Sequence, residues 1–227
     1  MATPPDLSAV VFDLDGLMFN TELLYPQVGR ELCRRRGKQF TDDLLHQMMG
    51  RPGNVSLQIM IDYHQLHGDT IDSLTSESTD IFLPLLDSHL APMPGCLELL
   101  DALEAAQIPK GVATSSSRRF VTDILSRFEL GSRFEFILSA EDVVHGKPDP
   151  EIYQTAAARL NREPREMMVL EDSENGCRAA VRSGAFAVAV PGDHSSQHDF
   201  SGAAFEAASL LDARIYQALK LTPPAMQ

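Results

Sequence analysis

The sequence predicts an α/β protein, a doubly wound parallel sheet with a small all-helical segment inserted after the first strand. Short apolar runs at 9–12, 110–114 and 167–170 do not alternate with polar residues, which is typical of strands buried on both faces of a parallel sheet. From residue 93 onward, helical patterns separate such runs, as a doubly wound fold requires. The stretch 17–92 contains no strand-like run, which predicts helices alone for that segment.

The elements of the sheet-containing part follow in order along the chain. The first strand, Ala9–Phe12, ends at Asp13-Leu14-Asp15-Gly16, and further strands are predicted at 134–138 and 185–190. Helices are predicted at 94–107, 118–128, 150–160 and 175–183, with a polar loop at 192–202 and a terminal helix at 205–219.

The inserted segment shows helical spacing of its own. Apolar residues recur every four positions at Leu24, Val28 and Leu32, which predicts a first helix. Further helices are predicted from about 42, around 55–63 and around 81–89, the last with Pro84 as a candidate break. We expect the arginines at 34–36 to form a solvated face of the first helix.

These patterns predict two domains within 227 residues, a length that suits a large core with a smaller insert. The core is predicted to comprise 1–16 and 93–227, and the helical domain 17–92.

Charge and cysteine content restrict the classes of function. The formal net charge of -13 disfavours binding to nucleic acid and to anionic membranes, although a bound divalent cation would still admit a small anionic substrate. The three cysteines form no Cys-x-x-Cys pair, and neither an apolar leader nor a stretch of ~20 apolar residues is present. We therefore expect a cytoplasmic protein, and a monomer by default.

Acidic residues follow two of the predicted strands. Asp13 and Asp15 are two positions apart, so a loop that turns at Gly16 can direct both carboxyl groups into one cleft. Glu171 and Asp172 follow the strand at 167–170 and offer oxygen ligands for a hard cation such as Mg²⁺. Either pair alone is also compatible with an ordinary turn or helix start.

Two further segments follow neighbouring strands and carry hydroxyl and amino groups. Thr114 and the serines at 115–117 precede a helix, where backbone N–H groups can bind an anion or the hydroxyls can simply cap the helix. Lys147 lies in a loop stiffened by Pro148 and can place a charge near a phosphate or remain solvated. The carboxyl ends of parallel strands share one edge, so these groups are expected to lie together with the acidic pairs.

The four segments in this order resemble the haloacid dehalogenase superfamily over residues 9–191. The helical insert resembles the small cap found in one branch of that superfamily, which includes β-phosphoglucomutase and pseudouridine-5′-phosphatase. The resemblance implies a Rossmann-like core with an α-helical cap, and a Mg²⁺-dependent phosphatase that acts on a small phosphate ester of sugar or nucleoside type through an aspartyl-phosphate. Asp13 would be the nucleophile and Asp15 the general acid and base. Asp15 favours phosphoryl transfer, because haloacid dehalogenases lack this second acid.

The resemblance also implies the remaining roles. Thr114 and Lys147 would be catalytic residues that bind and neutralise the phosphate. Substrate contacts would come from Gly16, Ser115, Ser116 and Arg51, the last equally compatible with a solvated loop. The metal ligands would be Asp13, Asp15 through its backbone carbonyl, Asp172 and Glu171.

Other chemistries of this superfamily fit the sequence less well. The only lysine in 17–92 is Lys38, which lies away from the Gly50-Arg51-Pro52 loop where a phosphonate hydrolase would need one. A β-phosphoglucomutase-type mutase has a linker histidine where Tyr25 and Pro26 stand here. A phosphatase is the simpler interpretation, with a mutase or a catalytically idle phosphometabolite-binding relative as the alternatives.

Overall fold

The computed structural model describes residues 6–48 and 53–224. The chain divides into two compact units, one formed by 1–19 with 92–227 and the other by 20–91. The sequence analysis placed these boundaries at 16/17 and 92/93. The role of the helical unit as a cap stays a prediction. No helix among the described residues is both long and apolar enough to cross a membrane.

The first unit is built on a parallel sheet of six strands in the order β3-β2-β1-β4-β5-β6. The strands are β1 (Ala9–Phe12), β2 (Lys110–Ala113), β3 (Phe136–Leu138), β4 (Met167–Glu171), β5 (Phe186–Ala189) and β6 (Phe205–Glu206). The first, second and fourth strands are buried along their whole length, as expected of runs that do not alternate with polar residues. The doubly wound parallel sheet predicted from the sequence is confirmed.

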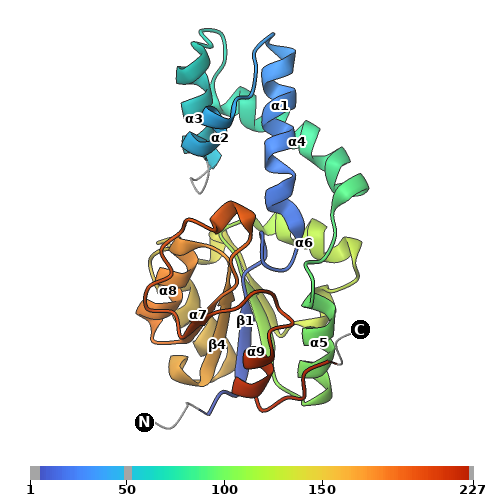
Figure 1. Cartoon of the computed structure of the whole chain (residues 1–227), viewed down its shortest axis with the longest axis vertical. Coiled ribbons are helices and arrows are strands. Elements are labelled where there is room, and N and C mark those ends of the chain that lie inside the picture. Colours follow the sequence, from blue (N-terminus) through green and yellow to red (C-terminus); the bar gives the residue numbers. More distant parts are fainter. Residues whose placement is uncertain (1–5, 49–52, 225–227) are drawn as a thin grey trace. The chain divides into compact units, whose positions relative to one another are not determined.

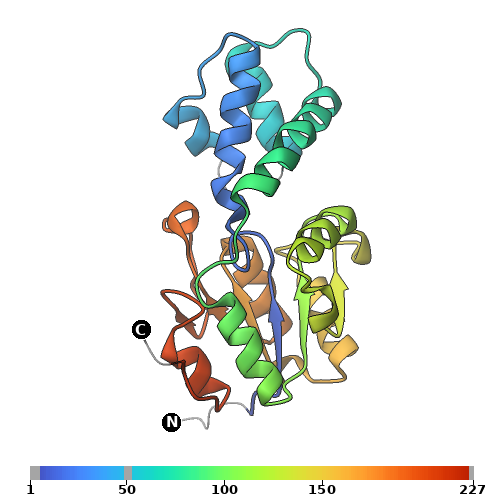
Figure 2. The same ribbon diagram turned by 90° about the vertical axis from the view of Figure 1, so that its right-hand side faces the viewer.

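Helices cover both faces of this sheet. The helices of the unit are α5 (Cys96–Ala105), α6 (Arg118–Arg127), α7 (Glu151–Leu160), α8 (Glu174–Ser183) and α9 (Ala213–Ala218). Helices α7 and α8 pack against one face of the sheet through buried residues such as Tyr153, Ala156 and Ala180. Figures 1 and 2 show α5 on the opposite face of the sheet from these two helices. The three cysteines are free and buried.

One element of this unit was predicted wrongly. The sequence pattern indicated a helix over 205–219, but the chain forms β6 first and only then the short helix α9. The Phe205 and Glu206 positions pair with Val188 and Ala189 of β5, so the sheet extends by one edge strand. A strand of two residues is too short to show an alternating or continuous apolar pattern, so its sequence did not predict it.

The described residues of 20–91 form helices and no strand. The helices are α1 (Tyr25–Arg35), α2 (Asp42–Met48), α3 (Gly53–His64) and α4 (Ile71–His89). Leu24, Val28 and Leu32 are all buried, as their four-residue spacing predicts. The candidate break at Pro84 is wrong, because α4 continues through it. Burial of Ile81, Phe82 and Leu86 around the proline outweighs the single backbone hydrogen bond that it removes.

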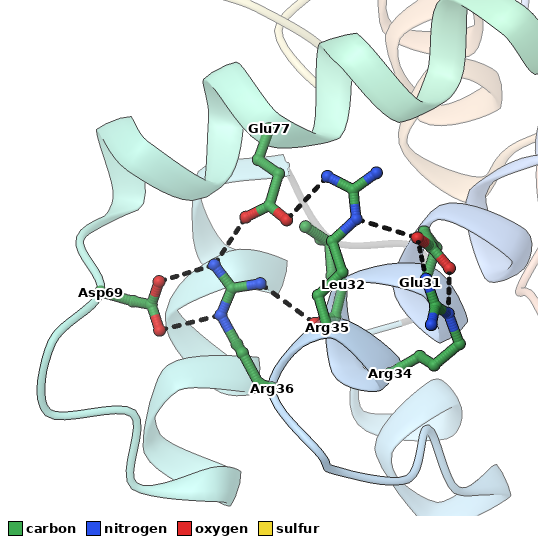
Figure 3. A network of polar contacts seen from close by, with 7 residues as sticks. All are labelled: Glu31, Leu32, Arg34, Arg35, Arg36, Asp69 and Glu77. Atoms are coloured by element: carbon green, nitrogen blue, oxygen red, sulfur yellow. Dashed lines mark hydrogen bonds and ion pairs between the residues drawn. The ribbon is translucent and has the colours of Figure 1, made fainter.

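The arginines at the end of α1 are not a uniformly solvated face. The Arg36 side chain is 17% exposed and donates to Asp69 through Nε and Nη2, at 2.9 and 2.6 Å, and to Glu77 through Nη2 at 2.6 Å. Arg35 bridges Glu31 and Glu77 (Figure 3). The Arg36 guanidinium is the main cause of the lowered pKa of both Asp69 and Glu77. This network ties the end of α1 to α4 and to the loop before it.

Candidate active site

Asp13 and Lys147 meet at the carboxyl edge of the sheet. Asp13 follows β1, is buried, and its backbone N–H donates to the carbonyl of Leu170 in the neighbouring strand β4 at 3.0 Å. Lys147 donates through Nζ to Asp13 Oδ1 at 2.6 Å, to Glu171 Oε1 at 2.7 Å and to the Ala113 carbonyl at 2.9 Å. One buried ammonium group therefore connects the ends of β1, β2 and β4, which lie at the same edge of the parallel sheet.

The electrostatics of this pair follow from burial and from the local excess of carboxylates. Burial raises the pKa of Asp13 well above its usual value, and Glu171, Asp172 and Asp15 raise it further, while Lys147 opposes them. Burial disfavours the charged form of Lys147, but Asp13 and Glu171 prevail and its pKa lies well above its usual value. The protonated form of Lys147 is thus favoured, but its single positive charge does not offset the negative charge of the acids around Asp13.

Glu171 is fully buried and has donors on both oxygens. Its Oε1 accepts from Lys147 and from the Tyr153 hydroxyl at 2.8 Å, and its Oε2 accepts from the backbone and the hydroxyl of Ser173 at 3.1 and 2.9 Å. The Tyr153 ring lies 5.1 Å from Lys147 Nζ. Tyr153 and Ser173 were not among the predicted site residues, and together they fix Glu171 against the lysine.

Gly176 in α8 makes room for the Glu171 carboxyl group. A Cβ atom at position 176 would overlap that carboxyl group, which the buried site holds on four hydrogen bonds. We predict that Gly176→Ala displaces Glu171 from Lys147, lowers the free energy of unfolding by about 1–3 kcal/mol and lowers kcat/KM roughly 100-fold. Chemical denaturation and steady-state kinetics measure the two effects.

Gly131→Ala is the matched control, because a Cβ at Gly131 meets nothing within 4 Å. We expect it to match the unaltered protein in both measurements. Unchanged activity in Gly176→Ala would show that the position of Glu171 does not matter to the site.

Asp15 contacts the segment after β2. Its Oδ2 accepts from the Ser116 hydroxyl at 2.5 Å and from the Thr114 hydroxyl at 3.4 Å. Gly16 follows with a positive φ of 78°, and its backbone N–H donates to the Phe19 carbonyl at 2.9 Å. A glycine is needed at this turn because residues with a Cβ rarely adopt that conformation.

The segment Thr114–Ser117 joins β2 to α6. The N-terminal amides of Arg118 and Phe120 in α6 donate to Glu141 and Ser117, at 2.9 and 3.4 Å. The Glu141 carboxylate and the Ser117 hydroxyl therefore cap the helix at these two amides, and an anion site has to be built from residues nearer the strand end. Thr114, Ser115 and Lys147 do line a common pocket of roughly 220 Å³, together with Val143, Val144 and Gly146.

Asp13, Glu171 and Asp172 form a buried group in which one carboxylate oxygen from each lies within 4.8 Å of the others. Three acids with one lysine leave an excess of negative charge in a desolvated site, and oxygen ligands in this arrangement suit a hard divalent cation. The residues present therefore fit Mg²⁺. The carboxyl group of Asp15 is not a member of this group and turns to Ser116 instead.

The structure thus brings together Asp13, Lys147, Glu171 and Asp172, with Asp15, Thr114 and Ser116 in contact beside them. Arg51 lies outside the described residues. The sequence analysis missed His194, whose Nε2 lies 2.6 Å from Asp172 Oδ2. A histidine shortly after the end of a parallel strand was the signal that could have found it.

Comparisons with known proteins show the family to which this chain is similar. The model of the haloacid dehalogenase-like hydrolase family matches residues 10–190. A phosphorylated carbohydrates phosphatase from Thermotoga maritima is 33% identical over 182 residues, which cover 78% of this chain and 82% of that protein. A probable pseudouridine-5′-phosphatase from Drosophila melanogaster is 32% identical over 208 residues, 89% of each chain.

A solved structure has the same fold as this chain. The crystal structure of a putative β-phosphoglucomutase from Thermotoga maritima superposes with a TM-score of 0.77 at 28% identity, covering 94% of this chain and 97% of that one. The family match spans both strand ends that carry the acids and the lysine loop between them. The chain belongs to the haloacid dehalogenase-like hydrolases and is a phosphatase, a phosphoric monoester hydrolase, of that family.

Proposed function

We propose that this protein hydrolyses a small phosphorylated metabolite, of sugar-phosphate or nucleoside-phosphate type, through an aspartyl-phosphate on Asp13. The observation that carries the proposal is the Asp13 carboxylate, buried at the strand edge with Lys147 Nζ 2.6 Å away. The names of the relatives support the substrate class, since they concern phosphorylated carbohydrates and pseudouridine-5′-phosphate.

The chemistry assigned to the acids follows from their separate surroundings. Asp13 attacks phosphorus through a carboxylate oxygen, the P–O bond to the leaving group breaks, and Asp15 gives that oxygen a proton. Asp15 then takes a proton from water, which attacks the phosphorus of the aspartyl-phosphate and releases Asp13 and inorganic phosphate. Ser116 and Thr114 hold Asp15 through its Oδ2, apart from the three acids at the strand edge.

The other groups bind and neutralise charge. Thr114 and Ser115 line the pocket next to Lys147, where a phosphate oxygen would accept hydrogen bonds from them. Asp13, Asp172 and the backbone carbonyl of Asp15 would hold Mg²⁺, which when bound lowers the repulsion between the nucleophile and the phosphate. We assign Glu171 to holding Lys147, because both of its oxygens already accept two hydrogen bonds each.

The test is hydrolysis of 4-nitrophenyl phosphate and of a panel of phosphorylated metabolites, with Mg²⁺ and with a chelator. We expect phosphate release that depends on the metal and is restored when Mg²⁺ is added back. Absence of metal-dependent release on the whole panel would contradict the proposal and favour a catalytically idle, phosphometabolite-binding protein.

A phosphosugar mutase is the second candidate, favoured by the similarity to the putative β-phosphoglucomutase. The products separate the two activities. A phosphatase yields inorganic phosphate in step with loss of the ester, whereas a mutase converts one sugar phosphate into its isomer.

A further inference from the structure

His194 lies against an acid of the proposed metal site, and neither the proposed reaction nor the predicted roles use it. Its Nε2 is 2.6 Å from Asp172 Oδ2, and its side chain is 19% exposed against 4% for Asp172. An ionised carboxylate can only accept hydrogen bonds, so the imidazole nitrogen must carry the hydrogen. Nε2 can do so in both the neutral and the charged ring, and the contact therefore does not depend on the charge of His194.

The loop after β5 is built so that this ring reaches Asp172. The Val190 backbone donates to the Glu171 carbonyl at 2.7 Å, so the loop starts beside the strand end that carries Asp172. Gly192 and Ser195 then close a turn around His194: the Ser195 backbone donates to the Gly192 carbonyl at 3.1 Å, and the Gly192 backbone to Ser195 Oγ at 3.1 Å. Ser195 is fully buried, which fixes this turn to the rest of the unit.

Gly192 also leaves space for the imidazole. A Cβ atom at this position would come 2.9 Å from Cε1 of His194 and 3.0 Å from Nδ1, closer than real side chains pack. The histidine ring thus folds back over its own turn, and residue 192 has no side chain to push it off Asp172.

Asp172 needs such a partner because it faces other acids. Its carboxyl group lies with those of Asp13 and Glu171, and like charges at this distance repel one another. A hydrogen bond to one oxygen holds the Asp172 carboxyl group in place against that repulsion. The side chain then loses less conformational freedom when a cation binds.

We propose that His194 is a positioning residue for the metal site: it donates from Nε2 to Asp172 and so sets the affinity of the site for Mg²⁺. This inference rests on the proposed function, in which Asp172 is a metal ligand. Loss of such an outer hydrogen bond lowers metal affinity about 10–100-fold in other metalloproteins.

The test measures Mg²⁺ binding directly, by isothermal titration calorimetry on the full chain after treatment with a chelator. We expect His194→Leu to raise the Kd for Mg²⁺ about 10–100-fold. His194→Gln, which can place an amide N–H near the same oxygen, is expected to stay close to the unaltered protein. The concentration of Mg²⁺ for half-maximal activity should move with the Kd, whereas kcat at saturating Mg²⁺ stays close to its original value.

His198→Leu is the matched control. His198 lies on the same loop and accepts from the Glu174 backbone at 3.3 Å through Nδ1, rather than contacting Asp172. We expect its Kd for Mg²⁺ to equal that of the unaltered protein.

Three outcomes would overturn the inference. If the unaltered protein binds Mg²⁺ and His194→Leu binds it equally well, the inference fails while the proposed function stands. Nitrogen couplings of a directly bound imidazole in the electron spin echo spectrum of the Mn²⁺ complex would make His194 a ligand and not a positioning residue. If the unaltered protein neither binds nor needs a divalent cation, the proposed function fails, and the inference fails with it.

Discussion

Replacement of Asp13 by asparagine is expected to lower kcat roughly 10³- to 10⁶-fold while the protein stays folded, because the amide has no nucleophilic oxygen to attack phosphorus. Asparagine has nearly the shape of aspartate, and Lys147 keeps its hydrogen bonds to Glu171 and to the Ala113 carbonyl. Steady-state hydrolysis of 4-nitrophenyl phosphate measures the activity, and thermal unfolding followed by circular dichroism measures the fold.

Asp149→Asn is the matched control for this change. Asp149 lies two residues after Lys147 and accepts from the Glu151 backbone at 3.0 Å, a bond that the asparagine side-chain oxygen can keep. We expect its activity to match the unaltered protein. If Asp13→Asn retains an activity comparable with that control, another residue or water must be the nucleophile.

Replacement of Asp15 by asparagine is the second large effect that we expect, with a loss of about 10²- to 10⁴-fold on alkyl phosphates. An alkoxide leaving group needs a proton as the P–O bond breaks, and asparagine cannot supply it. The amide can still accept from Ser116 and Thr114, so the loop at 114–116 keeps its contacts with position 15.

The leaving group separates this role from a merely structural one. 4-Nitrophenolate leaves without a proton, so Asp15→Asn should still release a rapid burst of nitrophenol, followed by slow turnover because the aspartyl-phosphate lacks its general base. Stopped-flow absorbance measures both phases. Equal losses on alkyl and nitrophenyl substrates, with no burst, would indicate that Asp15 only supports the structure of the site.

The parallel strands could be predicted because burial on both faces leaves a local signature in composition. The runs at 9–12, 110–113 and 167–171 are buried at every residue. The strand β6 has only two residues and depends on pairing with β5, so its signal is not local. Pro84 was misjudged for a related reason, since tertiary burial along α4 decides whether that helix continues.

The site could be predicted in part for the same physical reason. Residues that directly follow parallel strands are brought to one edge by the topology alone, and this placed Asp13 and Asp172 together. Lys147 reaches the same edge from the loop after β3. The partners that orient them, Tyr153 and His194, lie on a helix and in a loop. Which oxygen each of them meets depends on side-chain packing, about which spacing in the sequence carries no information.

The most direct test of the proposed mechanism is to trap the phosphorylated enzyme during turnover. Acid quenching within milliseconds, reduction with borohydride and mass spectrometry of the peptides would convert an aspartyl-phosphate into homoserine at the modified position. The mechanism predicts homoserine at position 13 when substrate is present, and none without substrate or in Asp13→Asn. Hydrolysis at full rate with no modification at position 13, or with the label on another residue, would contradict it.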